Sequence, residues 1–424
     1  MERSRGRVGA SRRLRAGVTV LAAGAVLVAA PGVAHADTVR GLSWHLDYLR
    51  IGAAHAISQG EGVIVAVIDS GVDAGHPDLV GQVLPGWGIG GDAAPDGRTD
   101  SDPKGHGTGM AGLIAGKGGG DQHVLGIAPK AKILPVSLGV QADGAEIAQG
   151  IRWASSHGAT VINISLAYQS LPEIEDVKSA LGEASAKGVV IVAGAGNSSV
   201  NGSDVGVPAS IPGVVAVSAM DKSGQSWSGS SHGPAVAVAA PGVRIVSTDP
   251  KAGTASGYGV SDGSSDSAAI VSGEAALIRS NFKQLSAANV INRIIRTAKD
   301  AGKAGRDDLY GFGVIDPVAA LTADVPEVRD NPLLGAKPDG SAKPGSASPT
   351  GQPLVSAHVD WKIMGPLLAV VAVVVGGIVW LTTASNRRRR RAAQRPAGYP
   401  PMGHPGGPGY PPPGYGPPPP PPGH

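Results

Sequence analysis

Three side chains with complementary chemistry occur along the chain in the order carboxylate, imidazole, hydroxyl. Asp69 directly follows a short apolar run at residues 63–68, and a glycine turn comes next. His106 has a glycine on each side, and Ser265 stands near the start of a helix expected to run to residue 280. A serine nucleophile needs a histidine to accept its proton, and that histidine needs an acid to fix its tautomer. Together the three residues predict acyl-transfer chemistry.

Each of these residues also has an ordinary structural explanation when it is taken alone. Asp69 could form a turn, His106 could be a hydrogen-bonded core residue, and Ser265 could cap a helix. A serine at a helix N-terminus, however, has free backbone N–H groups beside it, which can hold an oxyanion as charge develops. The occurrence of all three in one order favours the catalytic interpretation.

The chain from residue 62 onward alternates apolar runs with stretches typical of helices. Five runs predict strands, at residues 63–68, 132–136, 160–164, 189–192 and 214–217. Three stretches between them predict helices, at residues 109–115, 144–157 and 177–187. Continuous apolar strands that alternate with helices indicate an α/β fold, a three-layer sandwich with a mostly parallel central sheet. In such sheets the chemistry lies beyond the carboxyl ends of the strands, where Asp69 is expected.

The body of the chain resembles the subtilisin-like serine proteases and, within them, the mycosins attached to type VII secretion systems. The chain order Asp, His, Ser is the subtilisin one. The resemblance covers about residues 46–321, and six segments carry it: residues 65–72, 105–108, 163–166, 193–197, 239–242 and 308–313. It implies a subtilisin-like fold and hydrolysis of peptide or protein substrates.

The resemblance also implies a role for each site residue. Ser265 would attack the peptide carbonyl, His106 would take its proton, and Asp69 would orient the imidazole. Asn197 would bind the oxyanion through its side-chain amide, together with the N–H of Ser265. The substrate pocket would be bounded by Ser165, Leu166 and Gly194. This chemistry requires no metal and no other cofactor, and the expected partner, besides substrate, is the type VII secretion machinery.

The nucleophile motif departs from the family pattern at four positions, Ser264, Asp266, Ser267 and Ala269. Asp266 stands where an apolar residue is expected, and Ala269 replaces a proline. An ionised carboxylate about 6 Å from the oxyanion, at an effective dielectric near 20, would oppose the developing charge by roughly 3 kcal/mol. That corresponds to about a hundredfold in rate. Asp266 is therefore expected to slow the reaction.

Both ends of the chain have the composition of targeting or anchoring segments. Six arginines, an apolar run and two small residues before position 37 predict a signal peptide. Residues 363–384 carry no charge and, at about 1.5 Å per residue, can cross a bilayer core of roughly 30 Å. Five arginines at 387–391 place the tail in the cytoplasm. The sequence thus predicts a single-pass cell-membrane protein whose catalytic domain is extracytoplasmic.

The predicted organisation has six parts. They are a signal peptide at 1–36, an N-terminal arm at 37–60, a subtilisin-like catalytic domain at 61–322, a Pro/Gly/Ser-rich linker at 323–362, a transmembrane helix at 363–384, and a basic then Pro/Gly/Tyr-rich cytoplasmic tail at 385–424.

The chain has no cysteine, which excludes disulfides and a thiol nucleophile. Of the net charge of +3, residues 1–36 contribute +5 and residues 385–424 contribute +6, leaving −8 for the middle. A nucleic-acid partner is not expected for such a body.

Two functions remain open on the sequence. The first is a serine endopeptidase associated with type VII secretion, working through Asp69, His106 and Ser265. The alternative is a weakly active or inactive protease fold that serves as a structural component of a membrane secretion complex, which the altered serine motif favours.

Overall fold

The computed structural model describes residues 38–250 and 256–335, and its centre is one parallel sheet. The strands are β1 (Ile64–Asp69), β2 (Trp87–Gly88), β3 (Lys132–Ser137), β4 (Val161–Ile164), β5 (Val190–Gly194), β6 (Val215–Met220) and β7 (Val236–Pro241). They lie in the order β2-β3-β1-β4-β5-β6-β7, and each neighbouring pair is parallel. The expected α/β fold with a mostly parallel sheet is confirmed.

Strand β1 shows why these segments are apolar at every position. Val65 and Val67 belong to one buried hydrophobic cluster, whereas Ala66 and Ile68 belong to another on the opposite face. Successive side chains of a strand point to opposite faces, so a strand that is covered twice needs apolar residues throughout. The continuous apolar runs of the sequence therefore reflect a sheet with helices on both faces.

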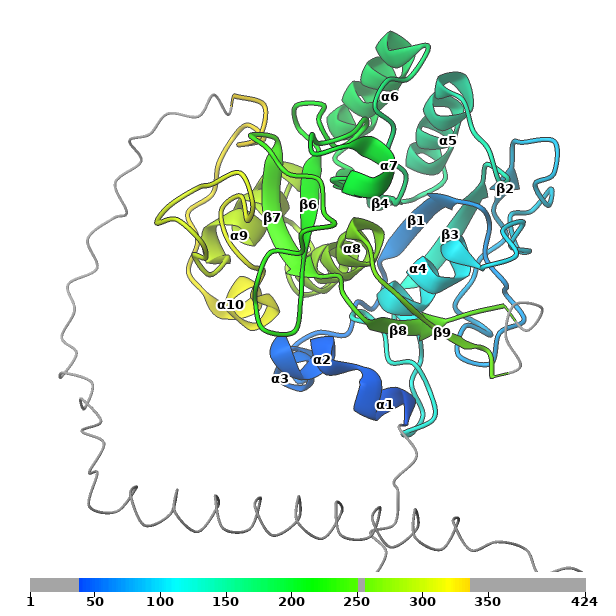
Figure 1. Ribbon diagram of the computed structural model, residues 1–424, viewed down its shortest axis with the longest axis horizontal. Coiled ribbons are helices and arrows are strands. Elements are labelled where there is room, and N and C mark those ends of the chain that lie inside the picture. Colours follow the sequence, from blue (N-terminus) through cyan, green and yellow to red (C-terminus); the bar gives the residue numbers. More distant parts are fainter. Residues whose placement is uncertain (1–37, 251–255, 336–424) are drawn as a thin grey trace, which may run out of the picture. The chain divides into compact units, whose positions relative to one another are not determined.

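Four longer helices supply these two covers (Figure 1). They are α4 (His106–Ala115), α5 (Gly144–Ser156), α6 (Ile174–Ala186) and α8 (Ser264–Asn281). Helices α5 and α6 pack in the cluster that contains Ile68, and α4 and α8 pack in the cluster that contains Val67. Each helix predicted from the sequence is present, with its ends displaced by up to three residues.

Several elements were not predicted from the sequence. Besides β2 and β7, they comprise the antiparallel pair β8 (Ile245–Thr248) and β9 (Tyr258–Ser261), and the helices α1 (Val39–Leu42), α2 (Trp44–Tyr48), α3 (Ile51–His55), α7 (Ser198–Asn201), α9 (Ala287–Thr297) and α10 (Pro317–Thr322). The β8–β9 pair packs against α4 and thus lies close to His106.

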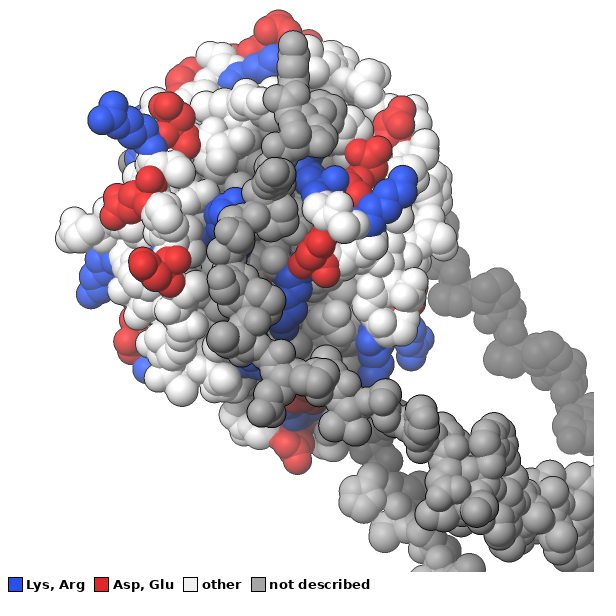
Figure 2. All heavy atoms as spheres, turned by 90° about the vertical axis from the view of Figure 1, so that its left-hand side faces the viewer, with Lys and Arg blue, Asp and Glu red and all other residues white. Residues whose placement is uncertain are grey.

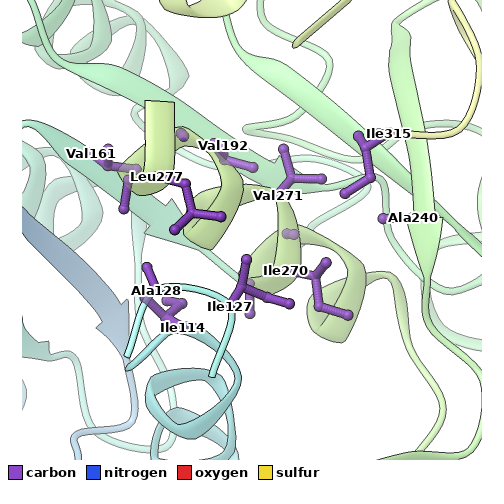
Figure 3. Close-up of a cluster of buried hydrophobic side chains, with 14 of the residues drawn as sticks. Ile114, Ile127, Ala128, Val161, Val192, Ala240, Ile270, Val271, Leu277 and Ile315 are labelled. Atoms are coloured by element: carbon purple, nitrogen blue, oxygen red, sulfur yellow. The ribbon is translucent and has the colours of Figure 1, made fainter. Parts of the chain in front are cut away.

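Helix α8 runs through the core and determines where Ser265 lies. It is buried from Asp266 to Ile278, and Figure 3 shows Ile270, Val271 and Leu277 among side chains from α4, β4 and β5. A helix that is buried all round cannot rotate or slide without opening cavities, and each buried aliphatic side chain that is lost costs about 2–5 kcal/mol. The N-terminus of α8 is therefore held firmly against the carboxyl edge of the sheet.

The described parts of the segments that flank the predicted catalytic domain, residues 38–60 and 323–335, make contacts with that domain. In the N-terminal arm, the indole N–H of Trp44 donates to the carbonyl of Val243 at 3.1 Å. Beyond α10, Leu333 is buried and the side chain of Asn331 donates to the carbonyl of Gly213 at 2.8 Å. Within residues 38–250 and 256–335, no helix combines the length and apolar character that a membrane span requires.

The predicted signal peptide, transmembrane helix and cytoplasmic tail fall outside the described residues, as does most of the linker, so the domain boundaries stay predictions.

On the face of the body near α9 and β7, acidic and basic side chains of the described residues are interspersed, and neither sign of charge forms a patch (Figure 2).

One buried carboxyl group has no evident partner. Glu274 in α8 is fully buried, and neither of its side-chain oxygens has a hydrogen-bond partner among the described residues. Burial, with a smaller contribution from Asp316, raises the pKa of Glu274 well above its usual value. The side chain is thus held in the folded protein as a neutral acid.

We predict that Glu274→Gln removes a pH-dependent loss of stability. The folded protein keeps the Glu274 proton while the unfolded chain releases it above about pH 4.5, so wild-type stability falls as pH rises from there. The variant should match the wild type near pH 4 and exceed it at pH 8, by about 1.4 kcal/mol for each unit by which the two pKa values differ. Denaturant unfolding at several pH values measures the difference.

The matched control is Glu175→Gln, because the Glu175 side chain is 81% exposed. It should leave the pH profile close to that of the wild type. A Glu274→Gln profile parallel to the wild type would show that the carboxyl group ionises normally.

Candidate active site

Asp69 and His106 form a hydrogen-bonded pair at the carboxyl edge of the sheet. Asp69 is the last residue of β1, and His106 is the first residue of α4. The Nδ1 atom of His106 lies 2.8 Å from Oδ1 of Asp69, which is only 1% exposed. The same oxygen accepts the backbone N–H of Ser70 at 2.8 Å. The bond to Asp69 leaves the Nε2 side of the imidazole available for proton transfer.

Two glycines allow the start of α4 to approach β1 so closely. A side chain at Gly107 would place its Cβ 2.1 Å from the carbonyl oxygen of Gly71 and 3.2 Å from Cβ of Asp69. Gly71 itself has a φ of 110°, a conformation that L-residues with a side chain rarely adopt. Gly107 and Gly71 therefore serve the close packing of α4 against β1.

A second acid, Asp100, holds the first turn of α4 in place. Its carboxylate accepts the backbone N–H of Thr108 at 2.8 Å, the hydroxyl of Thr108 at 2.6 Å, and the hydroxyl of Ser70 at 2.7 Å. The Ser70 oxygen in turn accepts the N–H of Gly107 at 3.1 Å. Acids that accept N–H groups at a helix N-terminus stabilise it. The sequence analysis missed Asp100 and Ser70, because nothing in the spacing marks them.

Ser265 is the second residue of α8 and shares a groove with His106. Its hydroxyl donates to the carbonyl of Ser165 at 3.1 Å, and the hydroxyl of Ser165 donates back to the carbonyl of Ser265 at 3.2 Å. The structure thus brings Ser265 to the same edge of the sheet as Asp69 and His106. The Ser265 hydroxyl points to the strand β4 side, so it must turn toward His106 before it can give up its proton.

Asn197 lies beside Ser265 in the groove and is oriented by Ser264. Its side-chain oxygen accepts the N–H of Ser264 at 3.1 Å and the Ser264 hydroxyl at 3.3 Å, and that hydroxyl accepts the N–H of Gly196 at 3.0 Å. Because the amide oxygen faces Ser264, the amide nitrogen faces the opposite side, toward Gly263. Ser264 is a positioning residue that the sequence analysis treated only as a departure from the family pattern.

The groove has a volume of about 600 Å³ and contains all seven site residues named from the sequence. Ser165 and Leu166 follow β4, and Gly194 ends β5. A side chain at Gly194 would lie 3.0 Å from the Ser264 backbone oxygen, so this glycine is also needed for the approach of α8. The groove lies at the carboxyl ends of three neighbouring strands, where ligands of parallel sheets bind. Among the described residues there is no group of three or more His, Asp or Glu side chains that could hold a metal ion.

Acidic neighbours make His106 unusually basic. Its side chain is 35% exposed. Burial lowers the pKa of His106, but the charge and hydrogen bond of Asp69, with smaller contributions from Asp266 and Asp100, outweigh it and raise the pKa to about 9. The imidazole is therefore mostly protonated at neutral pH, with only about one molecule in a hundred carrying the neutral base.

Asp266, the residue after Ser265 in α8, is buried. It is 1% exposed, and its Oδ1 accepts the hydroxyl of Ser261 at 2.8 Å. Burial raises the pKa of Asp266 to about 7, although the Ser261 hydrogen bond and the charge of His106 act in the opposite direction. The carboxyl group thus changes its charge near neutral pH, whereas the sequence analysis considered only the ionised form.

Comparison with known proteins gives the same family throughout. Residues 60–313 match the subtilase family. Mycosin-1 of Mycolicibacterium smegmatis is 36% identical over 338 residues, covering 67% of this chain and 73% of that protein. Subtilisin DY of Bacillus licheniformis is 37% identical over 269 residues, covering 62% of this chain and 92% of that protein.

A solved structure, that of MycP1 from the ESX-1 type VII secretion system, superposes with a TM-score of 0.60 at 34% identity and covers 68% of this chain and 88% of that one. Sequence and structure together confirm the resemblance to subtilisins and mycosins. The chain belongs to the subtilase family of serine peptidases, and mycosins are among its relatives.

Proposed function

We propose that the protein is a serine endopeptidase, anchored in the cell membrane and associated with type VII secretion, in which Asp69, His106 and Ser265 act together. The observation that carries the proposal is the 2.8 Å Asp69–His106 hydrogen bond, in one groove with Ser265 at the N-terminus of a buried helix. The link to secretion is supported by the mycosin relatives and by the similar structure from a type VII system.

In the proposed reaction, the Ser265 hydroxyl leaves the carbonyl of Ser165 and turns toward Nε2 of His106. The neutral imidazole takes the proton as the serine oxygen attacks the peptide carbonyl, and Asp69 stabilises the imidazolium that forms. The oxyanion accepts hydrogen bonds from the Asn197 amide and the Ser265 N–H, aided by the positive end of the α8 dipole. His106 then protonates the leaving amine, and water releases the acyl group by the same steps.

A second candidate, a structural component with little or no peptidase activity, is favoured by two features of the same site. The Ser265 hydroxyl is bonded away from His106, and His106 carries its proton at neutral pH. Both features slow the attack without preventing it. The protease fold would then contribute mainly a surface to the secretion complex.

We predict that a fluorophosphonate probe labels the wild-type protein on Ser265. The activated serine oxygen attacks phosphorus as it would a carbonyl, and the label is held covalently. Intact-mass spectrometry at pH 7–10 detects the adduct, and Ser265→Ala should show none. The variant Ser156→Ala, at an exposed serine of α5, leaves the groove intact and serves as the control for the loss of a serine elsewhere.

Absence of the adduct at every pH would refute the peptidase proposal. The structural candidate is tested in cells. If Ser265→Ala supports secretion as well as the wild type, whereas a chain lacking the folded body does not, the body acts as a scaffold.

We predict that Asp266→Met and Asp266→Asn both raise peptidase activity, by about twofold at pH 7, where about half of the Asp266 side chains are neutral, and by about tenfold above pH 8, where the carboxylate is ionised. Loss of this negative charge makes the imidazolium of His106 less stable, so the neutral base appears at lower pH. It also removes repulsion of the developing oxyanion. The pH profile of kcat/KM measures the shift, and unchanged or lower rates in both variants would contradict the account.

We predict that residues 363–384 anchor the protein. A chain that ends at residue 362 should leave the membrane fraction, because the 22-residue uncharged segment is gone. A chain that ends at residue 391 keeps the segment and its arginines and should stay in the membrane fraction. Cell fractionation separates the outcomes, and identical partitioning of the two chains would refute the anchor.

A further inference from the structure

We propose that a second pocket, which shares His106 with the groove, binds a lysine or arginine side chain of the substrate segment that follows the cleaved bond. This inference rests on the proposed function and adds a substrate preference to it. The pocket has a volume of about 420 Å³ and lies between the start of α4 and the β8–β9 pair. Its walls include Asp102, Met110, Thr248, Asp249 and Ser261.

The position of His106 identifies which part of the substrate reaches this pocket. His106, Asp102 and Lys104 line both the groove and the second pocket. In acyl transfer, the histidine that deprotonates the serine later protonates the leaving amine, so that amine must lie against the imidazole. Residues on the acyl side occupy the groove beside Ser165. The leaving segment must therefore continue past His106 toward the second pocket.

The acids of the pocket determine the chemistry of its ligand. Asp249 is 8% exposed, and its buried Oδ1 has no hydrogen-bond partner among the described residues. Its other oxygen lies near Gly259, 3.1 Å from the position that a Cβ there would take. A buried carboxylate without a partner is costly, and a cation that pairs with it removes the cost.

The negative charge of Asp249 is poorly compensated by the cations around it. Burial and the nearby carboxylate of Asp102 raise the pKa of Asp249, and His76 lowers it. His76 is itself occupied, because its Nε2 lies 2.8 Å from the carbonyl of Gly257. Two cations line the pocket among the described residues: His106, which is paired with Asp69, and Lys104, which is exposed and lines the groove as well. A lysine or arginine from the substrate would enter between Asp102 and Asp249, with its alkyl stem on Met110 and Thr248.

The test uses two leaving-side ligands, the dipeptide amides Lys-Ala and norleucyl-Ala, which differ in the terminal amino group of one side chain. Binding to the full-length Ser265→Ala protein in detergent is followed by the NMR signal of the His106 ring, which both pockets share. Lys-Ala should bind about tenfold more tightly than norleucyl-Ala, as for a charge pair at a partly exposed site. Asp249→Asn should abolish the preference with little change in shape, and Lys104→Gln should increase it.

Asp330→Asn is the matched control, because Asp330 is exposed and remote in the chain, and it should leave the preference unchanged. Equal affinity for the two ligands, or a preference that survives Asp249→Asn, would overturn the proposal. Cleavage of longer peptides by the wild type is measured separately. If the protein prefers Lys-Ala but cleaves no peptide, the second pocket is supported and the peptidase function is refuted. If it cleaves peptides without this preference, the peptidase function is supported and the second pocket is refuted.

Discussion

The hydrogen bond between Asp69 and His106 joins two segments that the chain places 37 residues apart, and the rest of the site is arranged around it. Asp69 is fixed because β1 lies in the middle of a sheet that is covered on both faces. His106 is fixed because Asp100 and Ser70 hold the first turn of α4 against β1. The imidazole is therefore held through its Nδ1 side, and Nε2 lies on the other side of the ring.

Burial of α8 provides the complementary constraint. The helix crosses the core in contact with β4, β5, β6 and β7, so its N-terminus meets the edge where these strands end. Ser265, the oriented amide of Asn197 and the walls of the groove come together there as a result of packing. Local hydrogen bonds, such as those between Ser264 and Asn197, then orient side chains in a site whose position the core packing determines.

The parts of this arrangement that the sequence predicts are those that depend on periodicity and on short motifs. Continuous apolar runs identified five of the seven sheet strands, and the order of Asp69, His106 and Ser265 indicated where to look for chemistry. Strand β7 was missed because alanine and proline, which are poor strand formers, make up most of it. The β8 and β9 strands were missed because they have only four residues each. Asp100 was missed because its contacts are tertiary, and the direction of the Ser265 hydroxyl depends on a carbonyl 100 residues away in the chain.

The most distinctive physical property of the site is the number of acids around one imidazole. Asp69, Asp100 and Asp266 all favour the protonated ring, and Asp266 itself changes charge near neutral pH. Such a site would work best in alkaline conditions, or after a substrate has displaced water and altered these charges. Asp102 and Asp249 extend the negative potential to the second pocket, where it would attract a positive side chain.

The most direct test of the Asp69–His106 interaction is NMR of the full-length protein with ¹⁵N-labelled histidine. We expect a far-downfield Nδ1 proton for His106 that persists through neutral pH, with the ring titrating at a pKa of about 9. The signal should remain in Ser265→Ala and disappear in Asp69→Ala. A ring that titrates near its ordinary pKa of 6.5, with no downfield proton, would contradict the account.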